Sequence, residues 1–225
     1  MFFLNISLLS ESVLFRGIQS DETEEMLHCL GAEHRKFEKT ARVFHAGDTV
    51  TELGLVLTGS ILIQNDDFWG NTTVLDHVMP GQIFAETYAF TGYPLMVDAV
   101  AAEAAEVLFL NVSRVLQTCP QACEHHSKLI RNLLFLSARK NLNLSRKIFH
   151  TSSKSIRGRL LSYLSFQSTR CGSRCFTIPF NRQQLADYLN VDRSALSNEL
   201  SKMQKDGLLR VNRNQFKLLC SHDML

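Results

Sequence analysis

The pattern of apolar and polar positions changes twice along the 225 residues of the chain. Residues 1–37 favour short helices, and Gly31 offers a stop for one of them. From about residue 40 to residue 112, short β-type runs alternate with glycines, which predicts a β-sandwich or barrel. Residues 66–71 predict a hairpin loop between two of these strands. The β-type runs cover residues 41–44, 53–57, 60–64, 72–75 and 106–110.

After Pro120 the pattern becomes helical and remains so from about residue 122 to residue 149. The predicted helix has apolar residues on two faces, and both must be buried. One face can cover the β domain, and we expect the other to pack against a second copy of the helix across a two-fold axis. A core helix within a single chain is the alternative. The first face consists of Leu129, Leu133 and Leu136, and the second of Ile130, Leu134, Leu144 and Ile148.

A further helix is expected from Ser155 to Ser168, with Ser152 or Ser153 as its N-cap. A loop of small residues, from Ser168 to Cys175, should follow it. The apolar residues expected to point inward from this helix are Ile156, Leu160, Leu161 and Leu164.

The most informative pattern lies between residues 181 and 207. Residues 182–189 predict a short helix, a tight turn follows, and Asp192 is a good N-cap for a second helix. That helix should run from Arg193 to about Asp206, with Gly207 as its stop. Two helices joined by so short a turn indicate a helix-turn-helix. At 100° per residue, the second helix places Leu196, Leu200 and Met203 on one face and Ser194, Ser197, Asn198, Ser201 and Lys205 on the other.

The polar face of this second helix can read DNA, because short polar side chains reach base edges and Arg193 can reach guanine or phosphate. Residues 208–219 then predict a hairpin whose tip, residues 212–214, forms a wing with Arg213 placed for phosphate. The alternative is an ordinary helical hairpin with a solvated polar face. The candidate DNA-binding residues are Arg182, Gln183, Arg193, Ser194, Ser197, Asn198, Ser201 and Arg213.

The distribution of charge supports DNA as a partner. Residues 1–145 carry 10 Lys and Arg against 17 Asp and Glu, whereas residues 146–225 carry 14 against 5. A compact basic region joined to an acidic remainder indicates that one end meets a polyanion. The apolar start of the chain lacks a positive leader, and no run is long enough to span a membrane, so we expect a cytoplasmic protein. The six cysteines are then expected to be thiols.

Five segments of the chain, residues 45–48, 56–60, 80–86, 181–189 and 191–197, match the pattern of a known family. Through them the chain resembles the cyclic-AMP receptor protein/fumarate-nitrate regulator (CRP/FNR) family of transcription regulators, most closely members from anaerobic Gram-positive bacteria. It implies an α+β chain: a cupin-like β-roll sensor domain similar to cyclic-nucleotide-binding domains (residues 1–118), a dimerisation helix (119–150) and a winged helix-turn-helix (151–225). It also implies a homodimer, a palindromic DNA operator, a small-molecule effector and, for an activator, RNA polymerase as partners.

The chain departs from the family pattern at several positions, and these limit which properties of the family can be expected of it. Glu86 matches the family's ribose-contacting Glu, but Leu95 and Met96 stand where cyclic-nucleotide binders have Arg and a hydroxyl. A buried phosphate would lack its charge-assisted partners there, and Asp98 would repel it, so we predict no ordinary cyclic-AMP binding. Glu86, together with Tyr93, could bind a different effector, or Glu86 could cap a turn. In the second predicted helix, Ser194 and Asn198 replace the Glu and Arg of many relatives, so the operator sequence is not transferable.

The cysteines and histidines raise three further possibilities. Cys119, Cys123 and His126 could hold zinc, iron or haem, although reduced buried thiols are the simpler interpretation. Cys171 and Cys175 could form a redox pair or remain plain thiols. Only Cys29 precedes the β domain, which disfavours an iron–sulfur cluster.

Three functional hypotheses follow. The first is a ligand- or redox-responsive dimeric transcription factor, and the second is a haem, metal or thiol sensor of gas or nitrosative stress on the same scaffold. The third, a cupin-like enzyme with an accessory DNA domain, would need several converging metal ligands. His45 and His77 do not provide that pattern, so we expect no enzyme and no catalytic residues.

Overall fold

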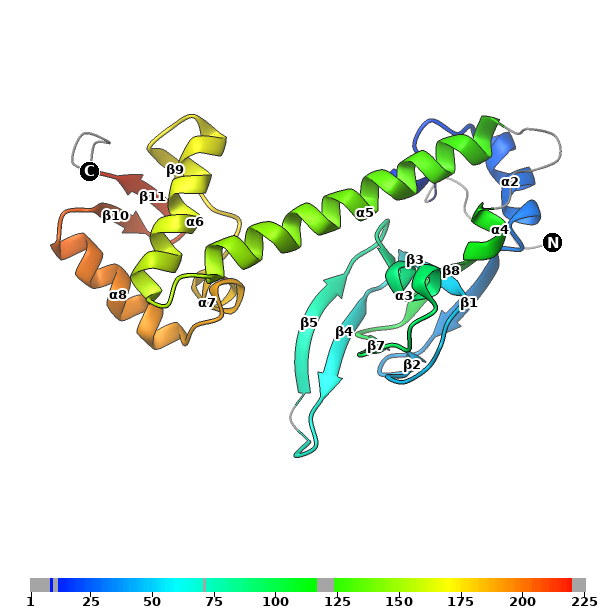
Figure 1. Cartoon of the computed structure of the whole chain (residues 1–225), viewed down its shortest axis with the longest axis horizontal. Helices are drawn as coiled ribbons and strands as arrows, with labels where there is room; N and C mark the ends of the chain where they lie inside the picture. Colours follow the sequence, from blue (N-terminus) through cyan, green and yellow to red (C-terminus); the bar gives the residue numbers. More distant parts are fainter. Residues whose placement is uncertain (1–8, 10–11, 71, 117–123, 220–225) are drawn as a thin grey trace. The chain divides into compact units, whose positions relative to one another are not determined.

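The computed structural model describes residues 9, 12–70, 72–116 and 124–219, and it divides the chain into two compact units, residues 1–137 and 138–225 (Figure 1). Helix α5 (Glu124–Thr151) contributes its first half to the first unit and its second half to the second. Each unit has its own hydrophobic core. No described helix is long and apolar enough to cross a membrane.

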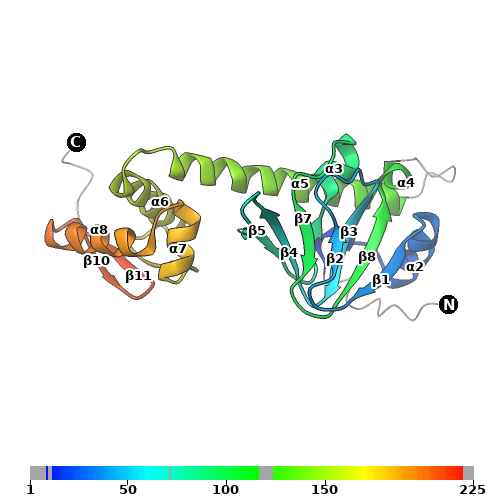
Figure 2. The same ribbon diagram turned by 90° about the horizontal axis from the view of Figure 1, so that it is seen from below.

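The first unit is an antiparallel β-sandwich with short helices at its ends (Figure 2). One sheet has the strand order β1-β8-β3-β6 and the other the order β2-β7-β4-β5. The helical segments are η1 (Val13–Phe15), α2 (Ser20–Cys29), α3 (Glu86–Thr91) and α4 (Val112–Leu116). The strands are β1 (Glu33–Phe37), β2 (Arg42–Phe44), β3 (Glu52–Thr58), β4 (Ile61–Asp66), β5 (Thr72–Val78), β6 (Ile83–Phe84), β7 (Asp98–Ala101) and β8 (Ala105–Asn111).

The β pattern of the sequence is confirmed, including the hairpin between β4 and β5, but the helical prediction for residues 1–37 is wrong at its end. Residues 33–37 form β1, which pairs antiparallel with β8. The residues of this strand are polar, and buried and exposed positions therefore do not alternate along it. Contacts with the paired strand stabilise it. Glu106 on β8 accepts a hydrogen bond from Lys36 at 2.8 Å and lies 2.9 Å from His34. These contacts also hold the pKa of Glu106 below its usual value, Lys36 being the main cause.

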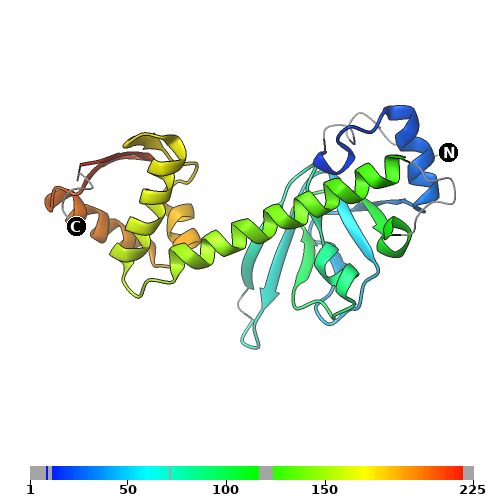
Figure 3. The same ribbon diagram turned by 45° about the horizontal axis from the view of Figure 1, so that its top comes forward.

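One apolar face of α5 packs against the β-sandwich, as the sequence predicts (Figure 3). Leu129 and Leu133 are buried in the core of the first unit, and Leu136 is partly buried against it. The second face of the helix is mostly uncovered, although Ile130 packs against the core. Its exposed members are Leu134 (68%), Leu144 (63%) and Ile148 (68%).

The second unit packs helices against a small antiparallel sheet with the strand order β10-β11-β9. Helix α6 is capped by Ser155, whose Oγ accepts a hydrogen bond from the N–H of Gly158 at 3.0 Å. The predicted cap at Ser152 or Ser153 is therefore wrong. Leu161, expected to point inward, is 41% exposed because the core is filled by Leu160, Tyr163 and Leu164. The elements are α6 (Ile156–Cys171), β9 (Cys175–Thr177), α7 (Arg182–Leu189), α8 (Arg193–Lys205), β10 (Leu209–Asn212) and β11 (Gln215–Leu218).

A buried histidine lies at the end of α5, within the second unit. His150 is 1% exposed, its Nδ1 lies 3.0 Å from the Oγ of Ser162, and its ring contacts those of Tyr163 and Phe166. Burial lowers the pKa of His150, and the charge of Arg146 lowers it further. The folded unit therefore holds this imidazole in its neutral form.

We expect the second unit to lose stability as the pH falls below about 6.5, the ordinary pKa of histidine. In that range the unfolded chain binds a proton that the folded unit resists, so unfolding becomes more favourable. Hydrogen exchange of peptides from α6 to α8, measured on the full chain between pH 7.5 and 5, reports this loss. His150→Phe keeps an aromatic ring and removes the titration, so it should flatten the pH dependence. An equal dependence in both proteins would contradict the assignment to His150.

Candidate nucleic-acid interface

Local hydrogen bonds fix the two helices of the predicted helix-turn-helix at the expected residues. Helix α7 begins at a capping box in which the N–H of Gln184 donates to Asn181 Oδ1 and the Asn181 N–H donates to Gln184 Oε1, both at 2.9 Å. The turn then passes through Asn190, whose φ of 53° is left-handed. Arg159 of α6 holds this turn by donating to the carbonyls of Leu189 at 3.0 Å and Asn190 at 2.9 Å.

Asp192 caps α8, as its sequence position predicts. Its Oδ1 accepts hydrogen bonds from the N–H groups of Ser194 (2.8 Å) and Ala195 (2.9 Å), and also from the Ser194 hydroxyl. The Ser194 hydroxyl is the main reason that the pKa of Asp192 is lowered, and the Ala195 N–H adds to it. The cap therefore fixes where the outward face of α8 begins.

The outward face of α8 carries the predicted DNA-reading residues. The side chains of Arg193, Ser194, Asn198 and Ser201 are exposed, and that of Ser197 is half-buried. The inward residues Leu196, Leu200 and Met203 are buried, as predicted. The structure thus separates the polar face from the apolar one along the whole helix.

The hydroxyl groups on this face are already oriented by the helix itself. Ser197 Oγ donates to the carbonyl of Arg193 at 2.9 Å, and Ser201 Oγ donates to the carbonyl of Ser197 at 3.0 Å. Their hydrogens point to the backbone, so both oxygens are left as acceptors toward a ligand. Arg193 and Asn198 supply donors on the same face, and the mixture suits the edges of base pairs in the major groove.

Acidic residues do not neutralise this face. Glu199 and Asp206 are both paired with Arg157 of α6, the Asp206 contact being 2.7 Å long. These hydrogen bonds, the one to Glu199 first, raise the pKa of Arg157. In the part of the chain that the structure describes, no carboxylate pairs with Arg193 or Arg213.

The two residues of α7 that we predict to contact DNA differ in how far their side chains are exposed. Gln183 is exposed, but its Nε2 donates to Asp187 Oδ1 at 2.8 Å, which leaves its carbonyl oxygen for a partner. Arg182 is half-buried at the first position of α7, and burial lowers its pKa. Its guanidinium still remains charged at neutral pH, because arginine is not deprotonated in proteins.

The hairpin of β10 and β11 forms the predicted wing. Asn212 pairs with Gln215, so Arg213 and Asn214 make a two-residue turn. The sequence suggests that asparagine supplies the left-handed geometry of the tip, but the left-handed residue is Arg213, with a φ of 54°. Asn214 instead anchors the tip, because its Nδ2 donates to the carbonyl of Ile178 at 3.2 Å. The Arg213 side chain is exposed.

Removing the charge of Arg213 should weaken binding to all duplexes alike and reduce the slope of log affinity against log salt by about 1. Arg213→Gly is the cleaner variant, because glycine adopts the left-handed turn without strain. Arg213→Ala should give the same change in slope with an additional loss of stability. Anisotropy titrations over a series of salt concentrations measure the slope. A slope equal to that of the wild type would exclude Arg213 as a phosphate contact.

The candidate effector residues lie in the first unit. Glu86 is 5% exposed at the start of α3, directly after Ala85, whose backbone is left-handed, whereas Tyr93 is 71% exposed. Leu95, at the position of the family's Arg, is buried, whereas Met96, at the position of the hydroxyl, is 77% exposed.

The charge of Asp98 is already paired. Its carboxylate contacts Arg42 at 3.1 Å and accepts a hydrogen bond from the N–H of Ala46 at 2.7 Å. Asp98 is therefore a structural anchor between β7 and the segment after β2. The predicted repulsion of a phosphate by Asp98 is correspondingly reduced.

The candidate metal residues are only partly described. Cys119 and Cys123 lie outside the described residues. His126 is buried, and neither of its ring nitrogens has a hydrogen-bond partner among the described residues. Within the same residues, no group of three or more His, Cys, Asp or Glu could hold a metal ion. Cys29, Cys171 and Cys175 are exposed free thiols.

Comparison with known proteins identifies both units. Residues 34–121 match the cyclic nucleotide-binding domain, and residues 158–223 match the Crp-like helix-turn-helix domain. The two matches follow the domain order of CRP/FNR-type transcription regulators, which this chain therefore resembles. The predicted resemblance and the predicted α+β fold are therefore confirmed.

The individual proteins that this chain resembles differ from it at most positions of their sequences. It is 32% identical over 92 residues to the probable transcriptional regulator flp of Lacticaseibacillus casei, a match that covers 41% of this chain and only 42% of that protein. The catabolite activator protein of Thermus thermophilus has a similar fold, with a TM-score of 0.51, 22% identity and coverage of 92% and 93% of the two chains. The c-di-GMP responsive global regulator CLP of Xanthomonas campestris has a TM-score of 0.56, 19% identity and coverage of 90% and 100%.

Proposed function

We propose that this protein is a transcription regulator that acts in the cytoplasm and binds duplex DNA as a homodimer, through α8 and the wing. The observation that carries the proposal is the outward face of α8, where Asp192 caps a helix that exposes polar side chains and an arginine, Arg193, that forms no ion pair with a carboxylate among the described residues. The 14 basic residues against 5 acidic ones after residue 145 supply the electrostatic attraction. We assign the chain no catalytic activity.

The proposed DNA contacts divide by role. Arg193, Ser194, Ser197, Asn198 and Ser201 would contact base edges in the major groove. Arg182 and Gln183, at the first turn of α7, and Arg213, at the wing tip, would position the domain on the phosphates. A dimer would place two such helices about 34 Å apart, one turn of the duplex, so the operator should be palindromic.

The proposed domain roles follow the sequence boundaries: residues 1–118 sense an effector, 119–150 dimerise and 151–225 bind DNA. Effector binding in the first domain would shift the balance between two arrangements of the dimer. If the regulator activates, RNA polymerase would be a further partner. Buried Glu86 is the proposed effector contact, with Tyr93 exposed nearby in sequence.

Selection of bound duplexes from a random library, with the full chain at low ionic strength, tests the proposal. The expected result is enrichment of a palindrome whose half-sites lie about 10–10.5 base pairs apart. Fragments of the chain's own promoter region provide a second pool. The absence of any enriched duplex under every redox condition would overturn the proposal.

Cyclic AMP is not expected to be the effector. At about 1 mM it should change neither the unfolding temperature nor the affinity for the selected operator, because a ligand stabilises only the state that it binds. Leu95 is apolar and buried, and it offers the phosphate no donor. A regulator that binds cyclic AMP serves as the positive control in the same thermal assay. A dose-dependent rise in the unfolding temperature would contradict this prediction.

A second candidate, sensing through haem or a metal, is favoured by His126. A buried imidazole that has no hydrogen-bond partner among the described residues is unusual, and imidazole is an iron ligand in many haem proteins. The absorption spectrum and metal content of protein purified without oxygen test this candidate. A colourless, metal-free sample would remove it and would leave the DNA-binding proposal unchanged.

A further inference from the structure

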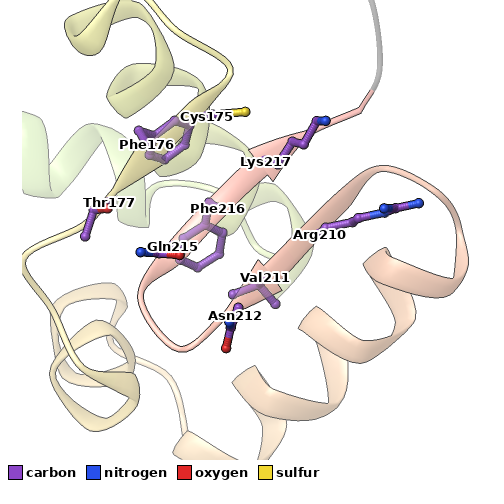
Figure 4. A pocket seen from close by; sticks show the side chains of 9 residues that line it. All are labelled: Cys175, Phe176, Thr177, Arg210, Val211, Asn212, Gln215, Phe216 and Lys217. Carbon is purple, nitrogen blue, oxygen red and sulfur yellow. The ribbon is translucent and has the colours of Figure 1, made fainter.

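On the outward face of the small sheet in the second unit, three residues on neighbouring strands lie directly opposite one another and form a row across the sheet. Arg210 of β10 lies opposite Lys217 of β11, and Lys217 lies opposite Cys175 of β9. All three side chains are exposed, and in Figure 4 they extend to the same side of the view. The residues that alternate with them, such as Phe176 and Phe216, face the core.

This row lines a hollow of about 440 Å³ on the sheet, a volume suited to a small ligand (Figure 4). A polar row, Asn212, Gln215 and Thr177, lies two residues further along the same strands and completes the floor. Neighbouring strands lie about 4.8 Å apart, so the row from Arg210 to Cys175 spans about 10 Å.

The charges of this row are not compensated by any carboxylate among the described residues. Two cations placed directly opposite each other on paired strands repel one another. In the described part of the chain, neither Arg210 nor Lys217 forms an ion pair with a carboxylate. The hollow therefore offers a site for an anion, and a bound anion would relieve the repulsion.

The third residue of the row adds a reactive group, a thiol, that the binding of an anion would not require. Cys175 is an exposed free thiol whose Cβ, as the register partner of Lys217, lies about 5 Å from that of the lysine. An anionic molecule held by Arg210 and Lys217 would have its opposite end beside the sulfur. A disulfide that carries carboxylates is one class of small anion that reacts with a thiol without a catalyst, by thiol–disulfide exchange.

We propose that this hollow binds a small peptide-like disulfide that carries carboxylates, and that Cys175 forms a mixed disulfide with it. The carboxylates lie on Arg210 and Lys217 while the Sγ of Cys175 attacks the nearer sulfur. The S–S bond of the reagent breaks, a new S–S bond to Cys175 forms, and the other half leaves as a thiolate that takes up the proton from Cys175. The reagent is reduced to one thiol, and Cys175 is the group oxidised.

Oxidised glutathione is the probe, and cystamine, a cationic disulfide, is its matched counterpart. The reduced full chain is treated with each at low conversion, and mass-spectrometric peptide mapping gives a rate for Cys175 and for Cys171. Cys171 is also exposed but lies outside the row. At Cys175 the wild type should react about ten-fold faster with the anionic reagent than with the cationic one.

The double variant Arg210→Gln, Lys217→Gln separates the proposal from general thiol reactivity. It should remove the preference for oxidised glutathione at Cys175 and leave the rates at Cys171 unchanged, a result that misfolding cannot imitate. An unchanged preference at Cys175 in this variant would overturn the proposal. So would a Cys171–Cys175 disulfide in the wild type together with no adduct at Cys175 in Cys171→Ser. Neither outcome depends on DNA binding.

Discussion

Replacing both Leu144 and Ile148 with aspartate should convert the protein to a monomer and weaken operator binding by about 10²–10⁴-fold, the gain that two linked sites normally provide. The two side chains are 63% and 68% exposed and lie one helical turn apart on α5. In a two-fold dimer each position meets its own copy or a close neighbour, so the double variant would bury four carboxylates. Burying unpaired charge is far more costly than the apolar contact is favourable.

Light scattering after size-exclusion chromatography gives the mass of the particle, and anisotropy gives the operator affinity. The matched control is Arg139→Asp with Asn143→Asp. These residues have the same spacing on the same helix and are exposed, but at 100° per residue they lie on the side away from Leu144. The control should remain a dimer and retain operator affinity within a few-fold. A dimeric Leu144→Asp, Ile148→Asp protein would show that this face of α5 is not the interface.

Features determined by neighbouring residues could be predicted from the sequence. The cap at Asp192 and the stop at Gly207 depend on contacts within about one turn of helix, and the apolar face of α8 follows from the helical spacing of Leu196, Leu200 and Met203. The structure places them at the predicted residues for that reason. The candidate DNA face is a direct consequence, since it is the side of α8 that the core leaves uncovered.

Features determined by distant residues could not be predicted. Strand β1 is recognisable only through its pairing with β8, because its own residues have no apolar alternation. Leu161 has the spacing of a core residue, yet other side chains already fill the core. The row on the small sheet could not be predicted either, because Arg210, Lys217 and Cys175 are brought together only by the register of three strands.

Arg193→Ala should weaken binding to the operator by about 1–3 kcal/mol, or about 5- to 150-fold, and should change binding to unrelated duplexes much less. Arg193 is exposed in the first turn of α8 and has no ion pair among the described residues, so its removal leaves nothing in the free protein to rearrange. The loss of binding free energy would therefore arise in the complex, where acceptors on a base or a phosphate would be left without a donor. Competition between operator and unrelated duplex measures both affinities in one experiment.

Two further variants determine what Arg193 contacts. Lys202→Ala removes a cation that lies about 180° from Arg193 around the same helix but only about 40° from Asn198, so it should weaken binding to both kinds of duplex to a similar extent through the lost charge. Arg193→Lys keeps the charge but cannot form the paired hydrogen bonds that a guanidinium makes to guanine. If lysine restores operator affinity, Arg193 contacts phosphate; if it does not, Arg193 reads a base. Operator affinity unchanged in Arg193→Ala would place Arg193 outside the DNA-contacting face, and the face would then have to begin at Ser194.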